Sequence, residues 1–307
     1  MKLSTTSMIE GRFGYAKMHE IFAKAGFECV DHSMDRLKND ADVLNGEHYR
    51  TEAENMRRDA EKNGLTVNQI HAPFSWSDAQ WADQSFYDTV IFPRVVRSLE
   101  IAGILGAKVA VVHPLHHFVY LGHEEEIYEK NMKYYRKLIP YAKEYGVKIG
   151  VENMYQGDPR RKHMIADTCA YIPEFIRYID SLDSEQVTAC LDIGHTTLVE
   201  QLDEPWDFIR ALGHDRLGAL HVHDTDYRND LHVVPYQGII NWNEVTRALG
   251  EIDYQGDFTY EVGAAWARWM DDESVQIYVR YMSEIGHRLI EKIDVAKANA
   301  ESCHGKL

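Results

Sequence analysis

The chain has 307 residues, of which 45% are hydrophobic and 27% charged, a composition typical of a globular enzyme, and it has no apolar run long enough to span a bilayer. The formal net charge of −16 repels a polyphosphate backbone at long range, which counts against nucleic acid as a partner. The first residues contain no secretory apolar stretch and the 4 cysteines form no C-x-x-C pair, so we expect a cytoplasmic protein with reduced thiols.

Short strand-like segments alternate with longer amphipathic segments along the whole chain. The predicted strands cover residues 2–8, 27–32, 65–71, 108–113, 147–153, 187–192, 216–223 and 257–262. The predicted helices lie near residues 14–25, 47–63, 86–105, 125–145, 168–182, 205–212, 241–252 and 272–293. This repeated order of strand and then helix predicts an α/β fold, a closed parallel (β/α)8 TIM barrel.

No linker or low-complexity tract divides the chain, so we predict a single domain over residues 1–307. The dipeptides Ala25-Gly26, Asn63-Gly64 and Tyr145-Gly146 repeat one device for ending a helix before a strand. An open doubly wound sheet is the alternative. That fold would place G-x-G-x-x-G after the first strand, whereas residues 8–14 read M-I-E-G-R-F-G, which favours the barrel.

Acids and histidines stand at the ends of the last four predicted strands. They are Glu152 in V-E-N-M, Asp192 in L-D-I-G-H, His221 in L-H-V-H-D and Glu261 in Y-E-V. In a barrel the carboxyl ends of the strands carry the chemistry, and strand alternation turns both His221 and His223 into the barrel mouth. Three carboxylates and an imidazole in a dry cavity require a cation to offset their desolvation. The oxygen-rich set suits Mn²⁺ best, with Mg²⁺, Co²⁺, Fe²⁺ or Zn²⁺ as alternatives.

At these residues the chain resembles the xylose isomerase-like TIM barrel superfamily. That group contains sugar and sugar-phosphate isomerases and epimerases, together with the class II apurinic endonucleases (AP endonuclease family 2). The segments that carry the resemblance are H-A-P-F at His71, V-V-H-P at His113, V-E-N-M, L-D-I-G-H, L-G-A-L-H-V-H-D, residues 230–242 and Y-Q-G-D-F-T-Y-E-V. They span the whole chain, and they specify the superfamily better than the substrate.

The resemblance implies roles for individual residues. The metal ligands would be Glu152, Asp192, His221 and Glu261, and the histidine three positions after the aspartate, His195, would contact the substrate. Ketose 3-epimerases have a substrate-binding glutamate six positions after the first ligand, where this chain has the shorter Asp158. Arg228 is the candidate for an arginine that follows the metal histidine in those enzymes, although the intervening H-D-T-D-Y segment departs from their pattern. We expect the remaining substrate contacts to come from His71, His113, His223 and His232.

A bound metal ion and two glutamates can together transfer a proton at the carbon next to a carbonyl group. We expect a sugar or sugar-phosphate isomerase or epimerase in which Glu152 and Glu261 transfer the proton and the metal stabilises an enediolate. A lyase or dehydratase acting on a keto-sugar would use the same route. Such an enzyme acts on a small carbohydrate. It could work as a single chain, as a homo-oligomer, or with a second subunit that completes the site. A binding role without catalysis, with the metal kept for structure, is a third class.

The main alternative is metal-dependent phosphodiester hydrolysis. Every metal-ligand position of the class II apurinic endonucleases has a residue of the same type here: His71, His113, Glu152, Asp192, His195, His221, Asp230, His232 and Glu261. The acidic balance and the absence of Arg/Lys-rich loops count against a nucleic-acid substrate. Asp230, His232 and Asp224 could bind a second ion, orient His221 or cap a loop.

The tryptophans and the remaining histidines have both functional and structural interpretations. Core or rim packing competes with a sugar-stacking role for Trp76, Trp81, Trp242 and Trp266. Core packing or simple exposure is expected for six further histidines, which are His116, His117, His123, His163, His214 and His287.

Overall fold

A computed structural model describes residues 1–115, 119–160, 162–199 and 203–304. Eight parallel strands follow one another around a single sheet in the order β10-β1-β2-β3-β4-β5-β8-β9. Their bounds are β1 Leu3–Thr6, β2 Cys29–Ser33, β3 Thr66–His71, β4 Val109–Val112, β5 Lys148–Glu152, β8 Val187–Asp192, β9 Leu217–His221 and β10 Phe258–Tyr260. Each strand coincides with a predicted one, and the order is that of a barrel laid open between its last two strands.

The barrel closes through main-chain hydrogen bonds between β9 and β10. The amide of Val222 donates to the carbonyl of Thr259 at 2.9 Å, and the amide of Glu261 donates to the carbonyl of Val222 at 3.0 Å. On the other side β10 pairs with β1, with Leu3 opposite Phe258. The first and last strands therefore meet, and the (β/α)8 barrel prediction is confirmed over the open sheet.

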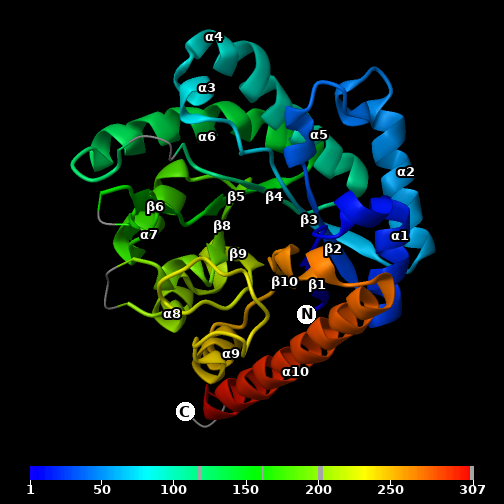
Figure 1. Cartoon of the computed structure of the whole chain (residues 1–307). Helices are drawn as coiled ribbons and strands as arrows, with labels where there is room; N and C mark the ends of the chain where they lie inside the picture. The colour runs from blue at the N-terminus through cyan, green and yellow to red at the C-terminus, as the bar shows by residue number, and fades with distance from the viewer. Residues whose placement is uncertain (116–118, 161, 200–202, 305–307) are drawn as a thin grey trace.

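Helices surround the strands on the outside (Figure 1). The main ones are α1 Glu10–Ala25, α2 Tyr49–Lys62, α5 Phe92–Leu105, α6 Glu124–Tyr145, α7 Ile172–Leu182, α8 Pro205–Arg216, α9 Trp242–Glu251 and α10 Asp272–His304. Gly26 and Gly146 end α1 and α6 in the left-handed conformation, with φ of 99° and 70°. This is the helix-ending device that the sequence predicted, since a side chain at either position would be strained.

Two helix bounds differ from the predicted ones for local reasons. α7 begins at Ile172 and not near residue 168, because Cys169 has a φ of 62° and Pro173 favours the first helical turn. α10 continues past residue 293 to His304, since the alanine-rich segment that follows contains no residue that stops a helix.

Some elements have no counterpart among the predictions. After β5 the chain forms an antiparallel hairpin of β6 Tyr155–Asp158 and β7 His163–Ala166. Short helices α3 Asp78–Ala82 and α4 Gln84–Phe86 follow β3, and a π-helical turn, η3 Tyr87–Ile91, leads into α5. The remaining turns are 3-10 helices: η1 Asp35–Lys38, η2 Val43–Asn45, η4 His195–Thr197 and η5 Ala265–Trp269. Several of these elements lie in the loops at the carboxyl ends of the strands, where they surround the candidate site.

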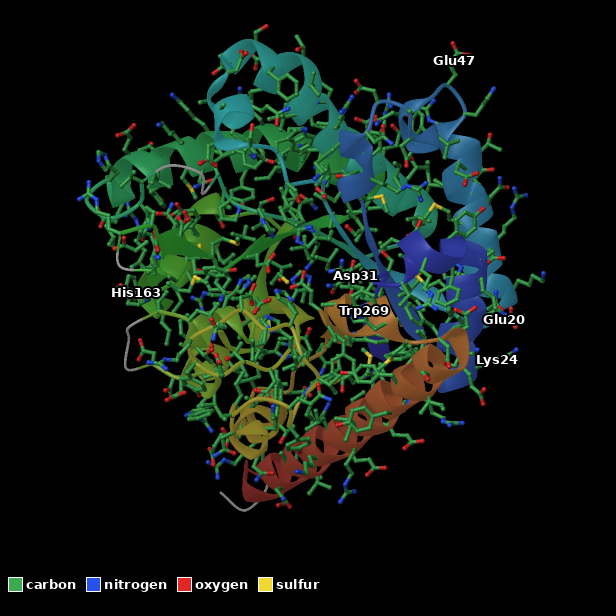
Figure 2. All side chains as sticks on the ribbon, in the orientation of Figure 1. Glu20, Lys24, Asp31, Glu47, His163 and Trp269 are labelled. Atoms are coloured by element: carbon green, nitrogen blue, oxygen red, sulfur yellow. The ribbon has the colours of Figure 1, made fainter. Side chains whose placement is uncertain are left out.

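The main core lies between the strands and the helices, where large side chains such as Phe22, Phe175 and Phe208 are fully buried. Figure 2 shows Asp31 toward the middle of the molecule, whereas Glu20 and Lys24 lie on α1 at its edge. The barrel interior also contains polar side chains, including the buried Asn68 and Gln69 of β3. Within the described residues, no helix combines the length and the apolar character that crossing a membrane requires.

Candidate active site

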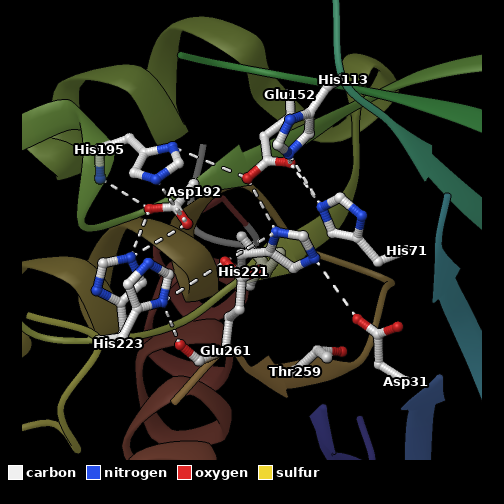
Figure 3. Close-up of polar contacts among 12 residues, drawn as sticks. Asp31, His71, His113, Glu152, Asp192, His195, His221, His223, Thr259 and Glu261 are labelled. Carbon is white, nitrogen blue, oxygen red and sulfur yellow. Dashed lines mark hydrogen bonds and ion pairs between the residues drawn. The ribbon is translucent and has the colours of Figure 1, made fainter. Parts of the chain in front are cut away.

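Four predicted ligands meet at the carboxyl ends of consecutive strands. Glu152, Asp192 and His221 are the last residues of β5, β8 and β9, and Glu261 follows β10 directly. One ligand atom from each lies within 4.8 Å of the others. Nδ1 of His221 lies 3.0 Å from Oε1 of Glu152 and 3.3 Å from Oε2 of Glu261 (Figure 3). The barrel topology therefore assembles this quartet from residues far apart in the sequence.

Local contacts fix Asp192 and the turn after it. The Asn153 side chain donates to the Asp192 carbonyl at 3.0 Å and accepts from the Asp192 amide at 2.8 Å, which joins the ends of β5 and β8. The His195 amide donates to Asp192 Oδ1 at 2.7 Å. At Gly194 a Cβ atom would lie only 2.0 Å from the His223 ring. The glycine of L-D-I-G-H is thus required for His223 to approach.

His71 and His113 form a second group with Glu152. Their Nε2 atoms are 3.0 Å apart, and His113 Nε2 is 3.1 Å from Glu152 Oε2. His71 Nδ1 lies 2.8 Å from the carbonyl of Ala72, which can only accept, so this nitrogen carries the hydrogen. In the neutral ring the His71 Nε2 lone pair therefore points at the His113 and Glu152 side chains. This is the tautomer that a metal-binding histidine needs.

A third group contains His195, His223, Asp230 and His232. His195 Nδ1 lies 2.8 Å from the carbonyl of Asn153, and His232 Nδ1 lies 2.7 Å from the carbonyl of Glu261. Both rings therefore have the tautomer seen at His71. His232 Nε2 is 2.8 Å from Asp230 Oδ2, and the His223 ring stacks on that of His232 with centroids 4.0 Å apart.

These contacts test whether the residues fit a divalent cation. Imidazole lone pairs and carboxylate oxygens converge, and Asp230 Oδ1 is buried with no hydrogen-bond partner among the described residues. A bound cation would compensate the burial of these atoms, which the hydrogen-bond donors of the described residues do not. The quartet, with three carboxylates, suits Mn²⁺ or Mg²⁺, and the two histidine-rich groups also suit Zn²⁺, Fe²⁺ or Co²⁺. The residues fit at least one divalent ion.

The acids of the site draw positive charge toward them. Burial lowers the pKa of His232, but the hydrogen bond to Asp230 and the charge of Glu261 outweigh it and raise this pKa to about 10. The pKa values of His71 and His195 also lie above the ordinary value, because nearby carboxylates outweigh burial. Burial lowers the pKa of His221, but Cys190, Glu261 and Glu152 outweigh it and raise this pKa as well. In the ion-free protein, protons on the imidazoles thus provide the positive charge that offsets the carboxylates.

The two glutamates have opposite shifts. Burial raises the pKa of Glu152, but the charges of His221 and His113 outweigh it and hold this pKa well below its ordinary value. Burial raises the pKa of Glu261 above its ordinary value, although His221 and His232 oppose the effect. Environments that separate two carboxyl groups in this way give one base and one acid.

A cavity of about 270 Å³ opens above these groups, and we call it the inner cavity. Its lining consists of Phe74, His113, Glu152, Met154, Tyr155, His195, Asp230, His232 and Glu261. Both glutamates thus face the space that a small substrate would occupy. A larger outer cavity of about 780 Å³ shares Phe74 and Tyr155 with it and is also lined by Trp76, Trp81, Asp158 and Arg160. Asp158 therefore lies in the outer cavity and away from the metal-ligand groups.

Not every predicted residue joins the site. Arg228 is exposed and lines neither cavity, so the arrangement gives no support to its predicted sugar contact. Asp224 caps the loop that carries Asp230 and His232, and its carboxylate accepts from the Tyr236 amide and the Trp242 indole, each at 2.8 Å. Trp242 is thereby a buried core residue.

Other predicted positions have simple placements. Trp266 stacks on Tyr278 at 4.2 Å, outside both cavities. His123 and His214 are exposed, and His163 and His287 are half-buried. His116 and His117 lie outside the described residues.

Two polar residues at the site were not predicted. The Tyr155 hydroxyl donates to Asp230 Oδ2 at 2.8 Å and its ring packs edge-on against His195. Asp31, in the middle of β2, lies 3.5 Å from His221 Nε2. The only sequence signal for Asp31 was its place close to the end of a predicted strand.

Curated relatives match part of the chain. An uncharacterised protein of Methanocaldococcus jannaschii is 30% identical over 196 residues, which is 62% of this chain and 63% of that protein. A D-psicose 3-epimerase of Enterocloster bolteae is 35% identical over 123 residues, 39% of this chain and 35% of that enzyme. The match thus spans about three fifths of the first relative and about a third of the epimerase.

Solved structures share the whole fold. The chain superposes on a D-tagatose 3-epimerase-like protein with a TM-score of 0.71 and 22% identity, covering 96% of this chain and 98% of that one. An L-ribulose 3-epimerase gives a TM-score of 0.73 at 14% identity, covering 98% and 97%. The family model described as xylose isomerase-like TIM barrel matches residues 20–281. The chain therefore belongs to the xylose isomerase-like TIM barrel family.

Proposed function

We propose that this protein is a divalent-metal-dependent epimerase or isomerase of a ketose or a ketose phosphate. The observation that carries the proposal is the placement of Glu152 and Glu261 in the lining of one small cavity, 3.0 Å and 3.3 Å from His221 Nδ1, with pKa values shifted in opposite directions. Relatives named as sugar 3-epimerases support the choice of substrate class. We propose Mn²⁺ as the ion, held by Glu152, Asp192, His221 and Glu261.

The bound cation would supply positive charge for the negative charge that develops on the substrate's carbonyl oxygen. Glu152, kept ionised by His221 and His113, is suited to accept the proton on the carbon beside the carbonyl. Glu261, whose pKa is raised, is suited to donate a proton from its own side of the cavity. Transfer by both residues inverts the carbon, and transfer by one residue gives isomerisation.

Solvent exchange tests this proposal. The Mn²⁺-loaded protein is incubated in deuterated water with D-psicose, D-tagatose or L-ribulose, and the products are analysed by NMR and mass spectrometry. We expect deuterium on the carbon beside the carbonyl together with the epimer or isomer. Glu261→Gln should stop the incorporation, whereas Glu174→Gln, a substitution outside the site, should not. A ketose or ketose phosphate panel without any incorporation would refute the proposal.

A second function, metal-dependent phosphodiester hydrolysis, is favoured by one observation. Besides the quartet, His71, His113 and Glu152 form a possible metal group, and so do His195, His223, Asp230 and His232. Several adjacent ions are typical of phosphodiester hydrolysis. The net charge of −16 opposes a nucleic-acid substrate.

Metal content and a nuclease assay separate the two functions. One tightly bound ion per chain, measured by elemental analysis, supports the epimerase or isomerase. Two or three ions, together with cleavage of a duplex containing an abasic site and no deuterium incorporation, support the hydrolase.

A further inference from the structure

The His221 ring lies between two sets of acids. On one side its Nδ1 faces Glu152 and Glu261, the proposed metal ligands, at 3.0 Å and 3.3 Å. On the other side its Nε2 lies 3.5 Å from Asp31 Oδ2. A dashed line marks this contact in Figure 3. Nε2 is buried and has no hydrogen-bond partner at ordinary distance among the described residues. Asp31 is therefore the acceptor available to an Nε2 hydrogen.

A chain of buried polar side chains holds Asp31 inside the barrel. Gln69 Nε2 donates to Asp31 Oδ2 at 3.0 Å, and Gln69 Oε1 accepts from the Thr259 hydroxyl at 3.4 Å. Thr259 accepts in turn from Asn68 Nδ2 at 2.9 Å, and Asn68 Oδ1 accepts from the Ser4 hydroxyl at 2.7 Å. The network runs through β1, β2, β3 and β10 beneath the quartet. It fixes the side of Asp31 that faces His221.

We propose that Asp31 is a positioning residue that holds His221 with its hydrogen on Nε2, so that the Nδ1 lone pair faces the proposed metal ligands. The inference rests on the metal site of the proposed function. An imidazole has one lone pair when neutral, so the acceptor on one side decides which nitrogen binds a cation. A carboxylate behind a metal-bound histidine also raises the basicity of the ring.

The burial of Asp31 gives a second argument. This side chain is 0% exposed, and a buried carboxylate is costly unless several donors satisfy it. Gln69 donates to Oδ2 of this carboxylate, and the same Oδ2 lies 3.5 Å from His221 Nε2. A hydrogen on His221 Nε2 provides a further donor. Oδ2 of Asp31 thus gains this second donor only in the tautomer that leaves Nδ1 free for an ion.

The test measures Mn²⁺ affinity by competition with a chelator, without any turnover assay. The proteins are the natural chain, Asp31→Asn, His221→Gln and the double variant, with circular dichroism to verify folding. We expect Asp31→Asn to weaken Mn²⁺ binding by about 10- to 100-fold. In the His221→Gln background, Asp31→Asn should not weaken Mn²⁺ binding further, because Asp31 acts on the metal through the imidazole of His221, which is absent there. Asp167→Asn, which changes a buried aspartate outside the metal-ligand groups, should bind Mn²⁺ as the natural chain does.

Each outcome decides one point. Unchanged affinity in Asp31→Asn, or an equal loss in the His221→Gln background, overturns the inference while the metal site stands. No Mn²⁺ binding by the natural chain overturns both. Weakened binding in a protein that epimerises no ketose overturns the proposed function and leaves the role of Asp31 intact.

A second measurement covers the case in which Asp31→Asn does not fold. Nitrogen-15 NMR of the natural chain loaded with Zn²⁺, with His221 assigned by its absence from His221→Gln, reports the tautomer directly. The hydrogen is expected on Nε2, and a hydrogen on Nδ1 overturns the inference.

Discussion

The rim of the barrel and the interface of α1, α2 and β2 each contain two histidines whose Nε2 atoms lie 3.0 Å apart. At the rim these are His71 and His113, and Glu152 approaches the same two nitrogens. In the interface they are His19 and His32, and the acids stand at the opposite nitrogens. Asp59 lies 2.9 Å from His19 Nδ1, and Glu10 lies 3.5 Å from His32 Nδ1.

This difference separates a hydrogen-bonded pair from a candidate metal group. With its Nδ1 hydrogen directed at Asp59, His19 accepts at Nε2 from the His32 Nε2 hydrogen, and the contact is an ordinary hydrogen bond. At the rim the carboxylate brings negative charge to the place where the nitrogens meet, beside a cavity. None of the described cavities is lined by His19 or His32. The position of the acid is thus more informative than the proximity of two histidines.

The largest expected effect concerns the two glutamates of the rim. Glu152→Gln and Glu261→Gln should each lower turnover at least about 100-fold, because a proton-transfer group is lost. Steady-state kinetics on the metal-loaded variants provides the measurement, with Glu174→Gln as the matched control. Near-normal turnover in both variants would move the chemistry away from the rim.

Metal content separates the two histidine pairs next. His113→Ala should remove or weaken an ion if the His71, His113 and Glu152 group is occupied, whereas His19→Ala should leave the metal content of the protein unchanged. Elemental analysis after dialysis measures both. If the protein holds a single ion in the quartet, His113→Ala should instead raise KM or lower kcat with that ion retained. Loss of an ion from His19→Ala would contradict the distinction between the pairs.

The interface pair should matter for stability. His19→Ala removes the partner of the buried His32 Nε2 and of the half-buried Asp59, so we expect a loss of about 1–3 kcal/mol in the free energy of unfolding. Urea denaturation measures this loss. Glutamine at the same position, which keeps a polar side chain, should recover part of it. An unchanged midpoint in His19→Ala would mean that the hydrogen-bond chain contributes nothing.

The smallest effect is a pH dependence of opposite sign at the two places. His71, His195 and His232 have raised pKa values, about 10 for His232, so their stabilisation is complete below pH 6.5 and is lost as pH rises toward the folded-state pKa. Burial and His32 lower the pKa of His19, so its contribution is present above pH 6.5 and is lost as pH falls.

Thermal unfolding between pH 5.5 and 9.5 would separate these two contributions. The metal-free protein should lose Tm above about pH 6.5, and Mn²⁺ should reduce this loss because the ion replaces the imidazole protons. His19→Ala should flatten only the acid side of the curve. Identical alkaline slopes with chelator and with Mn²⁺ would count against metal binding at the rim.

The barrel and the quartet were accessible from sequence because both depend on strand ends. V-E-N-M and L-D-I-G-H place an acid after a run of apolar residues, and in a barrel such ends meet at one rim. The hairpin of β6 and β7 was missed because its four-residue strands are mostly half-exposed and show no clean alternation. No sequence signal separates Trp242, a core residue, from Trp76 and Trp81, which line the outer cavity although Trp76 is buried as well.

The contacts behind the quartet could not be predicted, for a different reason. Asp31 meets His221 across the barrel, and His32, its neighbour in β2, faces the opposite way toward α1. Strand alternation predicts that these two side chains diverge, but no local pattern says which partner each of them meets. Such pairings depend on the register of strands far apart in the sequence.

The seam between β9 and β10 has a consequence for how the chain folds. Two main-chain hydrogen bonds join Val222 to Thr259 and Glu261, directly beside His221. Closing the barrel therefore also brings Glu261 to the rest of the quartet, and a nascent chain that has not yet made β10 lacks both the closed barrel and the complete quartet. A cation bound by residues on both sides of this seam would hold β10 in place. We therefore expect unfolding that begins with the opening of β10 to be much slower in the metal-loaded protein than in the metal-free protein.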